Sequence, residues 1–265
     1  MLLSIITVTF RDLHGLRRTI NSLARLRACS ENDVELIIID GGTGSDFQQI
    51  ASSLSGNVRI VSEPDDGIYD AMNKGLRMSR GDFVWFLNGG DECTIEKIQL
   101  FLSSLRRARG TMAFAGYSLD TGFGRISRKP RTSDYIWHGL PTSHQAIFYP
   151  GDIVRAQEYD LSYKIVGDYE LTARLLKMGV ESSAIDHEVA SFQLGGVSQR
   201  QARLVALEAS RVQKTTLGYR WHYRAVSRLR HIASRNLRRL QTREWARLTR
   251  PSRDASYPPA SLDNE

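Results

Sequence analysis

Short apolar runs alternate with segments of helical periodicity through the first 107 residues, and this alternation limits the possible folds more than any other feature of the chain. The runs are short and rich in Ile and Val, which predicts strands. The segments between them place apolar residues three or four positions apart, which predicts helices. Strands that alternate with helices of roughly ten to fifteen residues are typical of a parallel sheet with right-handed crossovers. We therefore expect an α/β fold, Rossmann-like and doubly wound, with a mostly parallel central sheet flanked by helices.

The predicted elements follow from this periodicity. Strands are expected at 4–10, 34–39, 58–61 and 82–87, and helices at 13–26, 45–54, 68–78 and 94–107. After Thr111 the pattern loosens into shorter strands at 112–117, 125–129 and 146–149, with a helix at 169–178.

Open sheets of this kind bind ligands beyond the carboxyl ends of their strands. The four segments that follow the first four predicted strands are Thr9–Asp12, Asp40–Thr43, Ser62–Gly67 and Asn88–Glu92. Three of them are rich in carboxylates and glycines. We expect these segments to form one ligand site.

Two of these segments are suited to nucleotide binding. Asp40 is followed by two glycines, and Asp65 and Asp66 precede Gly67. Carboxylates at such positions accept hydrogen bonds from a base or a ribose, and glycines let the backbone approach the ligand. Turns and helix caps are the alternative for all three acids.

The helix predicted after Gly67 adds two donor-binding candidates. Asp70, Asn73 and Lys74 are three or four residues apart and share a face. Asn and Lys near a helix N-terminus suit diphosphate or ribose contacts. A solvated helix face explains the same spacing.

Three further candidates differ in the chemistry that they suggest. Asp91 follows a very apolar strand and is placed to bind a divalent cation that bridges phosphate oxygens, while Asn88 of the same segment is a donor-binding candidate; a glycine-rich turn is the alternative for the segment. Asp168 opens a predicted helix and is either a general base or a helix cap. The pair His144 and Gln145 is either acceptor-binding or a packed histidine with its neighbour.

A loop at Gly195 and Gly196 is the last candidate and suits either an acceptor-side hinge or an ordinary turn.

The order of these segments is more specific than any one of them. The sequence Ser62-Glu63-Pro64-Asp65-Asp66-Gly67-Ile68-Tyr69-Asp70-Ala71-Met72-Asn73-Lys74-Gly75, followed by Trp85-Phe86-Leu87-Asn88-Gly89-Gly90-Asp91, resembles the inverting glycosyltransferases of family 2. Within that family the chain is most similar to transferases of colanic acid biosynthesis, through residues 143–148 and 195–198 as well. The resemblance covers Leu3 to about Ser198 and implies the A-type glycosyltransferase fold.

The resemblance also implies roles. Thr9, Arg11, Asp40, and Asp65 or Asp66 would bind a GDP- or UDP-sugar donor, and GDP-fucose is suggested by the colanic acid relatives. Asp91 would bind Mg²⁺ or Mn²⁺, and Asp168 would be the catalytic base.

The chain departs from the family at one point. Many relatives have Leu-Asp-x-Asp-Asp where this chain has Leu87-Asn88-Gly89-Gly90-Asp91, so one of the usual acids remains. A catalytically inactive module that binds sugar nucleotides or membrane surfaces is therefore the alternative function.

The positive charge is concentrated near the C-terminus. Residues 199–250 contain fourteen Lys and Arg against Glu208 and Glu244, a net charge of +12 that leaves −5 for the rest of the chain, since the total is +7. Leu and Trp recur between the arginines, which predicts an amphipathic helix for an anionic membrane. We expect a catalytic domain at 1–198, a basic helical tail at 199–250 and a disordered C-terminus at 251–265.

The expected location follows from the same observations. Cys29 and Cys93 form no CxxC pair, which favours a reducing compartment. No apolar run is long enough to span a bilayer. We expect a cytoplasmic enzyme, peripherally associated with the cytoplasmic membrane, whose acceptor is a lipid-linked saccharide. Nucleic-acid binding by the tail is the less favoured partner, and a helix packed on the domain is the structural alternative.

Overall fold

The computed structural model describes residues 1–121, 124–193 and 201–232. The strands are β1 (Leu3–Thr9), β2 (Val34–Asp40), β3 (Val58–Ser62), β4 (Phe83–Phe86), β5 (Glu92–Cys93), β6 (Met112–Asp120), β7 (Arg125–Arg128), β8 (Ile147–Pro150) and β9 (Ser182–Gln193). The helices are α1 (Leu13–Ala28), α2 (Ser45–Ser52), α3 (Ile68–Met78), α4 (Ile98–Arg107), α5 (Gly151–Gln157), α6 (Gly167–Lys177) and α8 (Ala202–Thr215). Two 3₁₀ turns, η1 (Ser133–Trp137) and η2 (His144–Ala146), precede β8.

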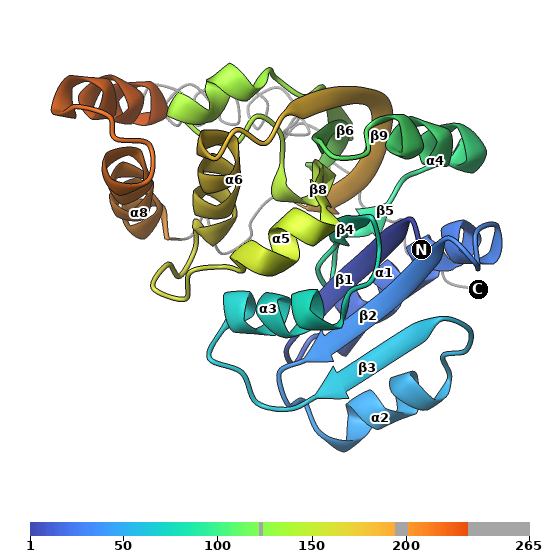
Figure 1. Cartoon of the computed structure of the whole chain (residues 1–265). Helices are drawn as coiled ribbons and strands as arrows, with labels where there is room; N and C mark the ends of the chain where they lie inside the picture. The colour runs from blue at the N-terminus through green and yellow to red at the C-terminus, as the bar shows by residue number, and fades with distance from the viewer. Residues whose placement is uncertain (122–123, 194–200, 233–265) are drawn as a thin grey trace, which may run out of the picture. The chain divides into compact units, whose positions relative to one another are not determined.

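The strands form one sheet in the order β3-β2-β1-β4-β8-β6-β9-β5, with β7 paired to β6 (Figure 1). Strands β1 to β4 are mutually parallel, β8 is antiparallel to β4 and β6, and β9 is parallel to β6. The chain order reverses beside β1, because β2 and β3 lie on one side of it and β4 on the other. The predicted mostly parallel α/β sheet is confirmed, and ligand sites are expected at such a reversal.

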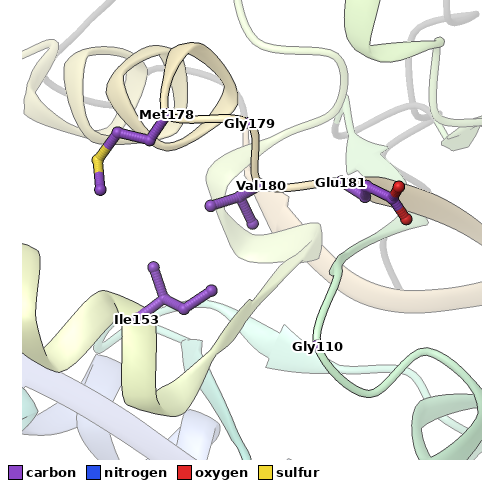
Figure 2. Close-up of a pocket in the computed structure, with 6 residues that line it drawn as sticks. All are labelled: Gly110, Ile153, Met178, Gly179, Val180 and Glu181. Carbon is purple, nitrogen blue, oxygen red and sulfur yellow. The ribbon is translucent and has the colours of Figure 1, made fainter.

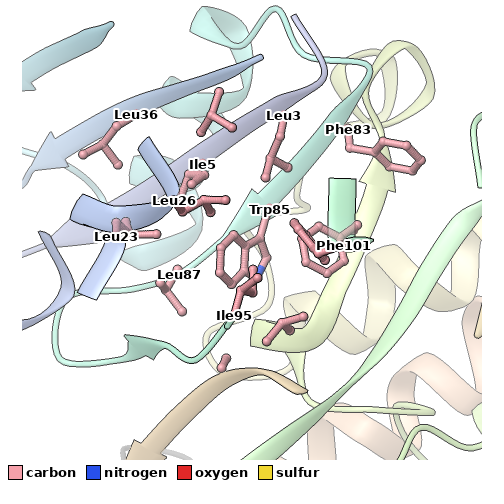
Figure 3. Packing of buried hydrophobic residues seen from close by; sticks show 14 of the residues in the cluster. Leu3, Ile5, Leu23, Leu26, Leu36, Phe83, Trp85, Leu87, Ile95 and Phe101 are labelled. Atoms are coloured by element: carbon pink, nitrogen blue, oxygen red, sulfur yellow. The ribbon is translucent and has the colours of Figure 1, made fainter. Parts of the chain in front are cut away.

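The two faces of the sheet bury different residues because side chains alternate along a strand. Leu3 and Ile5 of β1 pack into a cluster with apolar residues of α1, α2 and α4. Ile6 and Val8 point to the other face and pack with α3, α5 and α6. Trp85 of β4 is at the centre of the first cluster, among Leu3, Ile5, Ile95 and Phe101 (Figure 3).

Helix α3 packs close against β1 on one face of the sheet (Figure 1). A Cβ atom at Gly75 would be 2.5 Å from Cγ2 of Ile6, so this approach requires glycine. The segment before α3 is thereby held at the carboxyl ends of β2 and β3.

The structure differs from the prediction at three elements. Strand β9 was not expected, because its sequence Ser-Ser-Ala-Ile-Asp-His-Glu-Val-Ala-Ser-Phe-Gln lacks a clear alternation of apolar and polar residues. Helix α5 is seven residues long and was too short to show helical periodicity. Helix α4 begins at Ile98 rather than near Thr94, because the Thr94 amide still donates to the Val189 carbonyl of β9 at 3.0 Å.

The chain forms two compact units, Met1–Arg220 and Trp221–Glu265. The first extends beyond the predicted boundary at 198, because α8 buries Ala209 and Val212 against α6 and η1 residues. The described part of the second unit is a helix at 221–232. The predicted segment 251–265, and the tail from 233 to 250, lie outside the described residues. No helix among those described is long and apolar enough to span a bilayer.

Candidate functional site

The carboxyl ends of β1 and β2 are linked by the side chains of Asp40 and Thr43. Asp40 is fully buried and accepts hydrogen bonds from the Thr43 amide at 2.8 Å, the Thr43 hydroxyl at 2.5 Å and the Ser62 hydroxyl at 2.6 Å. The Thr43 hydroxyl in turn accepts a hydrogen bond from the main-chain N–H of Arg11 at 2.9 Å. Asp40 therefore holds the loops after β1, β2 and β3 together, and its direct contact with a donor base stays a prediction.

Thr9 and Arg11 line the end of β1. Thr9 is buried beside Gly89, where a Cβ atom would be 3.1 Å from the Thr9 hydroxyl oxygen. Arg11 is exposed, has φ of 54° and places its guanidinium 4.8 Å from the Phe10 ring centroid. A non-glycine residue in this left-handed region is unusual. The exposed Arg11 guanidinium is thus a candidate contact for an anionic ligand at this edge.

Asp65 and Asp66 occupy different positions. Asp65 is half-buried and lies over Gly41, where a Cβ atom would be 2.6 Å from Asp65 Oδ2. Asp66 is exposed. Neither acid is the N-cap of α3, which is Gly67, although Asp65 Oδ1 accepts a hydrogen bond from the Gly67 amide at 2.9 Å, as in a turn. Asp65 is thus the acid that faces the end of β2.

Two predicted donor-binding residues of α3 have structural contacts. The Asn73 side chain is buried and exchanges two hydrogen bonds with the Tyr159 main chain, at 3.0 and 2.7 Å. This pairing gives Asn73 a structural role in the described structure, and its contact with a donor stays a prediction. Lys74 donates to the Pro64 carbonyl at 2.7 Å and forms ion pairs with Glu63 and Asp70. Lys74 therefore holds the acidic loop in place.

Two side chains of helix α1 bind the main chain of the loop Asn88–Asp91. The Thr19 hydroxyl accepts a hydrogen bond from the Gly90 amide at 3.0 Å and donates to the Asp91 carbonyl at 2.6 Å. Arg18 donates to the Gly90 carbonyl at 2.9 Å. The Asp91 carboxylate is thus presented on a loop whose main chain is anchored at three points.

Gln145 reaches the same carboxylate. Its side-chain amide donates to Asp91 Oδ2 at 3.0 Å, and its own Oε1 accepts from the Ser143 hydroxyl at 2.5 Å. The main-chain carbonyl of Gln145 accepts from the buried Trp85 indole at 2.7 Å. The prediction placed Gln145 with an acceptor loop, whereas the structure places it against Asp91.

The Asp91 environment suits a cation. Burial raises the pKa of Asp91 to about 6, while the Gln145 amide lowers it. Asn88 Oδ1 is buried and has no hydrogen-bond partner within the described residues. Mg²⁺ and Mn²⁺ prefer oxygen ligands of these two kinds. The set of candidate metal ligands is small. Within residues 1–121, 124–193 and 201–232, no group of three His, Cys, Asp or Glu side chains is placed to hold a metal.

Asp168 lies in the first turn of α6 and is half-buried. Val166 occupies the cap position, so the helix-cap explanation of Asp168 is wrong. Burial raises the pKa of Asp168 to about 6, opposed by the hydrogen bond that the Tyr169 amide donates to Oδ1 at 2.8 Å. A carboxylate of this pKa is ionised at neutral pH and is a stronger base than an ordinary Asp.

His144 is a packed histidine rather than an acceptor contact. Its ring is buried, stacks 5.3 Å from Phe86 and bonds the Tyr159 hydroxyl at 2.8 Å. Burial lowers the pKa of His144 to about 4, so it is neutral at pH 7. The predicted loop residues Gly195 and Gly196 lie outside the described residues.

A hollow of about 530 Å³ lies elsewhere in the first unit, lined by Gly110, Ile153, Met178, Gly179, Val180 and Glu181 (Figure 2). Gly110 and Glu181 precede β6 and β9, so the hollow lies near the amino ends of these strands. The candidate site is at the opposite edge of the sheet.

Several site residues were not singled out from the sequence. Thr19 and Thr43 are ordinary threonines whose partners are distant in the chain. Tyr69 lies inside the motif Asp65–Gly75 but was given no role. Glu208 is one of two acids in the basic segment, and that contrast was a usable signal.

The chain has clear sequence relatives. The family profile described as "Glycosyl transferase family 2" matches residues 4–158. An uncharacterized glycosyltransferase of Mycobacterium tuberculosis is 32% identical over 179 residues, which cover 64% of this chain and 67% of the relative. A PGL/p-HBAD biosynthesis glycosyltransferase of Mycobacterium bovis is 26% identical over 208 residues, covering 68% and 76%.

Solved structures share the fold. Residues 1–349 of S. aureus TarS, crystallised with UDP-GlcNAc, match with a TM-score of 0.64 and 15% identity over 82% of this chain and 67% of that one. The crystal structure of TarS 1–349 alone matches with a TM-score of 0.63, and the chain spans 66% of it. The profile covers more than half of the chain, and the strand-end acids lie within it. The chain therefore belongs to glycosyl transferase family 2.

Proposed function

We propose that the chain is an inverting glycosyltransferase of the hexosyltransferase type that moves a sugar from a nucleoside diphosphate donor to a lipid-linked oligosaccharide. The observation that supports this most directly is Asp168, a half-buried carboxyl with a pKa of about 6 at the start of α6. Such a group accepts the proton of an acceptor hydroxyl as that oxygen attacks the anomeric carbon. A single displacement of this kind inverts the anomeric configuration and needs no covalent sugar–enzyme intermediate.

The donor would occupy the carboxyl ends of β1 to β4. We assign the base and ribose to the surface formed by Thr9, Arg11 and Asp65, supported by Asp40 and Ser62. Asp91 and Asn88 Oδ1, which has no hydrogen-bond partner in the described part of the chain, would hold the divalent cation. A bound Mg²⁺ or Mn²⁺ would neutralise charge on the departing diphosphate.

The finer identity of donor and acceptor rests on resemblance. The sequence at 62–75 and 143–148 is similar to colanic acid glycosyltransferases of the WcaE type, which suggests GDP-fucose and exopolysaccharide biosynthesis. The TarS structure with UDP-GlcNAc supports a UDP-sugar instead. Both classes belong in the first donor panel.

The test is release of nucleoside diphosphate from a panel of GDP- and UDP-sugars by the purified chain with Mg²⁺ or Mn²⁺ and a lipid-linked acceptor. We expect release from one donor, lost in Asp168→Asn and in Asp91→Ala. Asp152→Asn is the matched control, because its side chain is 98% exposed and lies on α5 at the amino edge of the sheet. Full activity of Asp168→Asn would refute the proposal. Donor binding without turnover of any donor would favour an inactive binding module.

We also propose that the chain associates peripherally with the cytoplasmic membrane through its basic C-terminal segment. The helix at 221–232 exposes apolar side chains, among them Trp221 at 70% and Leu229 at 66%. Arg224 and Arg228 lie between these two residues in the sequence, and Arg220 and Arg230 flank them. Exposed aromatic and apolar residues beside arginines suit an anionic bilayer surface.

Sedimentation with vesicles tests this part. The full chain is expected to sediment with phosphatidylglycerol-containing vesicles and not with pure phosphatidylcholine, and the variant Trp221→Ala/Leu229→Ala is expected to stay in the supernatant. Leu207→Ala removes an apolar residue of α8 that is also exposed, at 62%, and is the control. Equal sedimentation of both variants would contradict the proposal. A shift of DNA by the chain that the double variant keeps would instead indicate nucleic-acid binding by the arginines.

A further inference from the structure

We infer that Tyr69 of α3 and Glu208 of α8 are positioning residues that hold the turn bearing Asp168 from two sides. Both contact the main chain of residues 164–167, and neither is assigned a contact with donor or acceptor, so they are positioning rather than catalytic residues. The inference rests on the proposed role of Asp168 as the base. It assigns a function to the first helix of the basic segment, which had been predicted to belong to the membrane-binding tail.

Glu208 binds three consecutive amides of this turn. Its carboxylate accepts hydrogen bonds from the main-chain N–H groups of Lys164 at 2.8 Å, Ile165 at 3.0 Å and Val166 at 3.1 Å. The Glu208 side chain is buried, with 7% of the residue exposed. These three amides lie immediately before α6, and N–H groups at the start of a helix find no acceptor within it. A charged acceptor of three N–H groups fixes the path of the backbone immediately before Asp168.

Tyr69 holds the same turn from the other side. Its hydroxyl donates to the Ile165 carbonyl at 2.6 Å and accepts from the Gly167 amide at 2.9 Å. The ring leaves no room for a side chain at 167, since a Cβ atom there would be 2.8 Å from ring carbons of Tyr69. The ring also stacks on Tyr159, with centroids 5.1 Å apart. Tyr69 follows the donor-binding acids directly, so the two halves of the proposed site share this contact.

The two residues act on the base in opposite electrostatic senses. The negative charge of Glu208 raises the pKa of Asp168, whereas the Tyr69 hydroxyl lowers it by stabilising the ionised form. Burial is the largest cause of the raised pKa. The titratable groups that affect Asp168, or are affected by it, are Tyr69 of α3, Tyr149 of β8, Tyr159 after α5 and Glu208 of α8.

The experiment measures kcat, donor KM and the pH dependence of kcat for Glu208→Gln, Tyr69→Phe and the control Glu181→Gln, whose carboxyl is exposed. We expect kcat to fall by on the order of tenfold in the first two, because small displacements of a catalytic group are costly. Donor KM is expected to change less than kcat. The acidic limb of the kcat profile is expected to move to lower pH in Glu208→Gln and to higher pH in Tyr69→Phe.

Opposite shifts of the acidic limb in the two variants distinguish positioning of the base from damage to the fold. Damage to the fold would move the acidic limb of both variants in the same way. Thermal denaturation of each variant identifies one that fails to fold, and the other variant then decides. Wild-type kcat and an unmoved acidic limb in the folded variants would overturn the inference. Asp168→Asn is assayed in the same series. If it is inactive while Tyr69→Phe and Glu208→Gln equal the wild type, this inference alone fails, whereas an active Asp168→Asn refutes the proposed function itself.

Discussion

The side-chain amide of Gln145 donates a hydrogen bond to the Asp91 carboxylate at 3.0 Å, across 54 residues of sequence. The Ser143 hydroxyl donates to Oε1 of the same amide, and the buried Trp85 indole donates to the main-chain carbonyl of Gln145. Gln145 is thus fixed at both its side chain and its backbone. The proposed cation ligand is oriented by a residue from the other half of the chain.

Gln145→Ala is expected to raise the Mg²⁺ or Mn²⁺ concentration for half-maximal activity by on the order of tenfold, as loss of a partner to a metal ligand commonly does. The Trp85 contact survives, because it uses the main chain of Gln145. Metal titration of activity measures the change. Ser143→Ala keeps the amide and is expected to give a smaller shift in the same direction. An unchanged metal requirement in both variants would exclude Gln145 from this role.

The pH dependence of kcat is expected to fall on the acidic side near pH 6. Asp168 must be ionised to accept a proton, and its pKa is about 6, so each pH unit below that value lowers kcat by about tenfold. Measurement of kcat between pH 4.5 and 8 at saturating donor tests this. A midpoint near the ordinary Asp value of about 4 would show that the carboxyl is solvated during catalysis.

Asp168→Asn is expected to stabilise the folded protein at neutral pH. A carboxyl whose pKa is raised on folding binds more protons in the folded state, so its ionised form lowers the free energy of unfolding as pH rises from about 4 to 6. The amide removes that ionisation. We expect a gain of about 1–3 kcal/mol at pH 7.5 that vanishes below pH 4. Denaturant titration at the two pH values measures it, and equal stability of both proteins at pH 7.5 would contradict the raised pKa.

Asp65→Asn and Asp66→Asn are expected to differ. Asp65 lies over Gly41 at the end of β2, whereas Asp66 is exposed. A hydrogen bond from the sugar nucleotide to a charged carboxylate contributes about 1.5–3 kcal/mol of binding free energy. Its loss in Asp65→Asn is expected to raise the KM for the sugar nucleotide by more than tenfold. Asp66→Asn is expected to stay within about twofold, since an exposed charge contributes little. Equal effects would mean that the two acids share the contact.

Asn73→Ala tests the structural role of this residue. The substitution leaves the amide and carbonyl of Tyr159 without partners in a buried place, which is expected to destabilise the fold by about 2–4 kcal/mol. Donor KM of the folded fraction should remain near the wild-type value. Thermal denaturation and donor titration separate the two effects. A raised KM without loss of stability would support the donor-binding prediction for Asn73.

The local elements of the first half of the chain follow from its sequence. The run Val34–Asp40 is apolar and β-branched, and α3 has a clear apolar face against β1, so periodicity sufficed for both. The position of acids and glycines after β2, β3 and β4 also followed, because it is a property of chain order. Strand β9 did not follow, since its burial comes from pairing with β6 rather than from its own pattern.

The sequence by itself determined the mostly parallel sheet, the edge at which ligands are expected to bind and the identity of Asp91 and Asp168 as candidates. Only the tertiary structure decided which side chains are available to a ligand. Asn73 and His144 form hydrogen bonds with Tyr159. Gln145 donates to Asp91, and Glu208 accepts from the turn before Asp168. The physical reason is that a hydrogen bond between distant segments depends on where the sheet brings them, and no local periodicity records that distance.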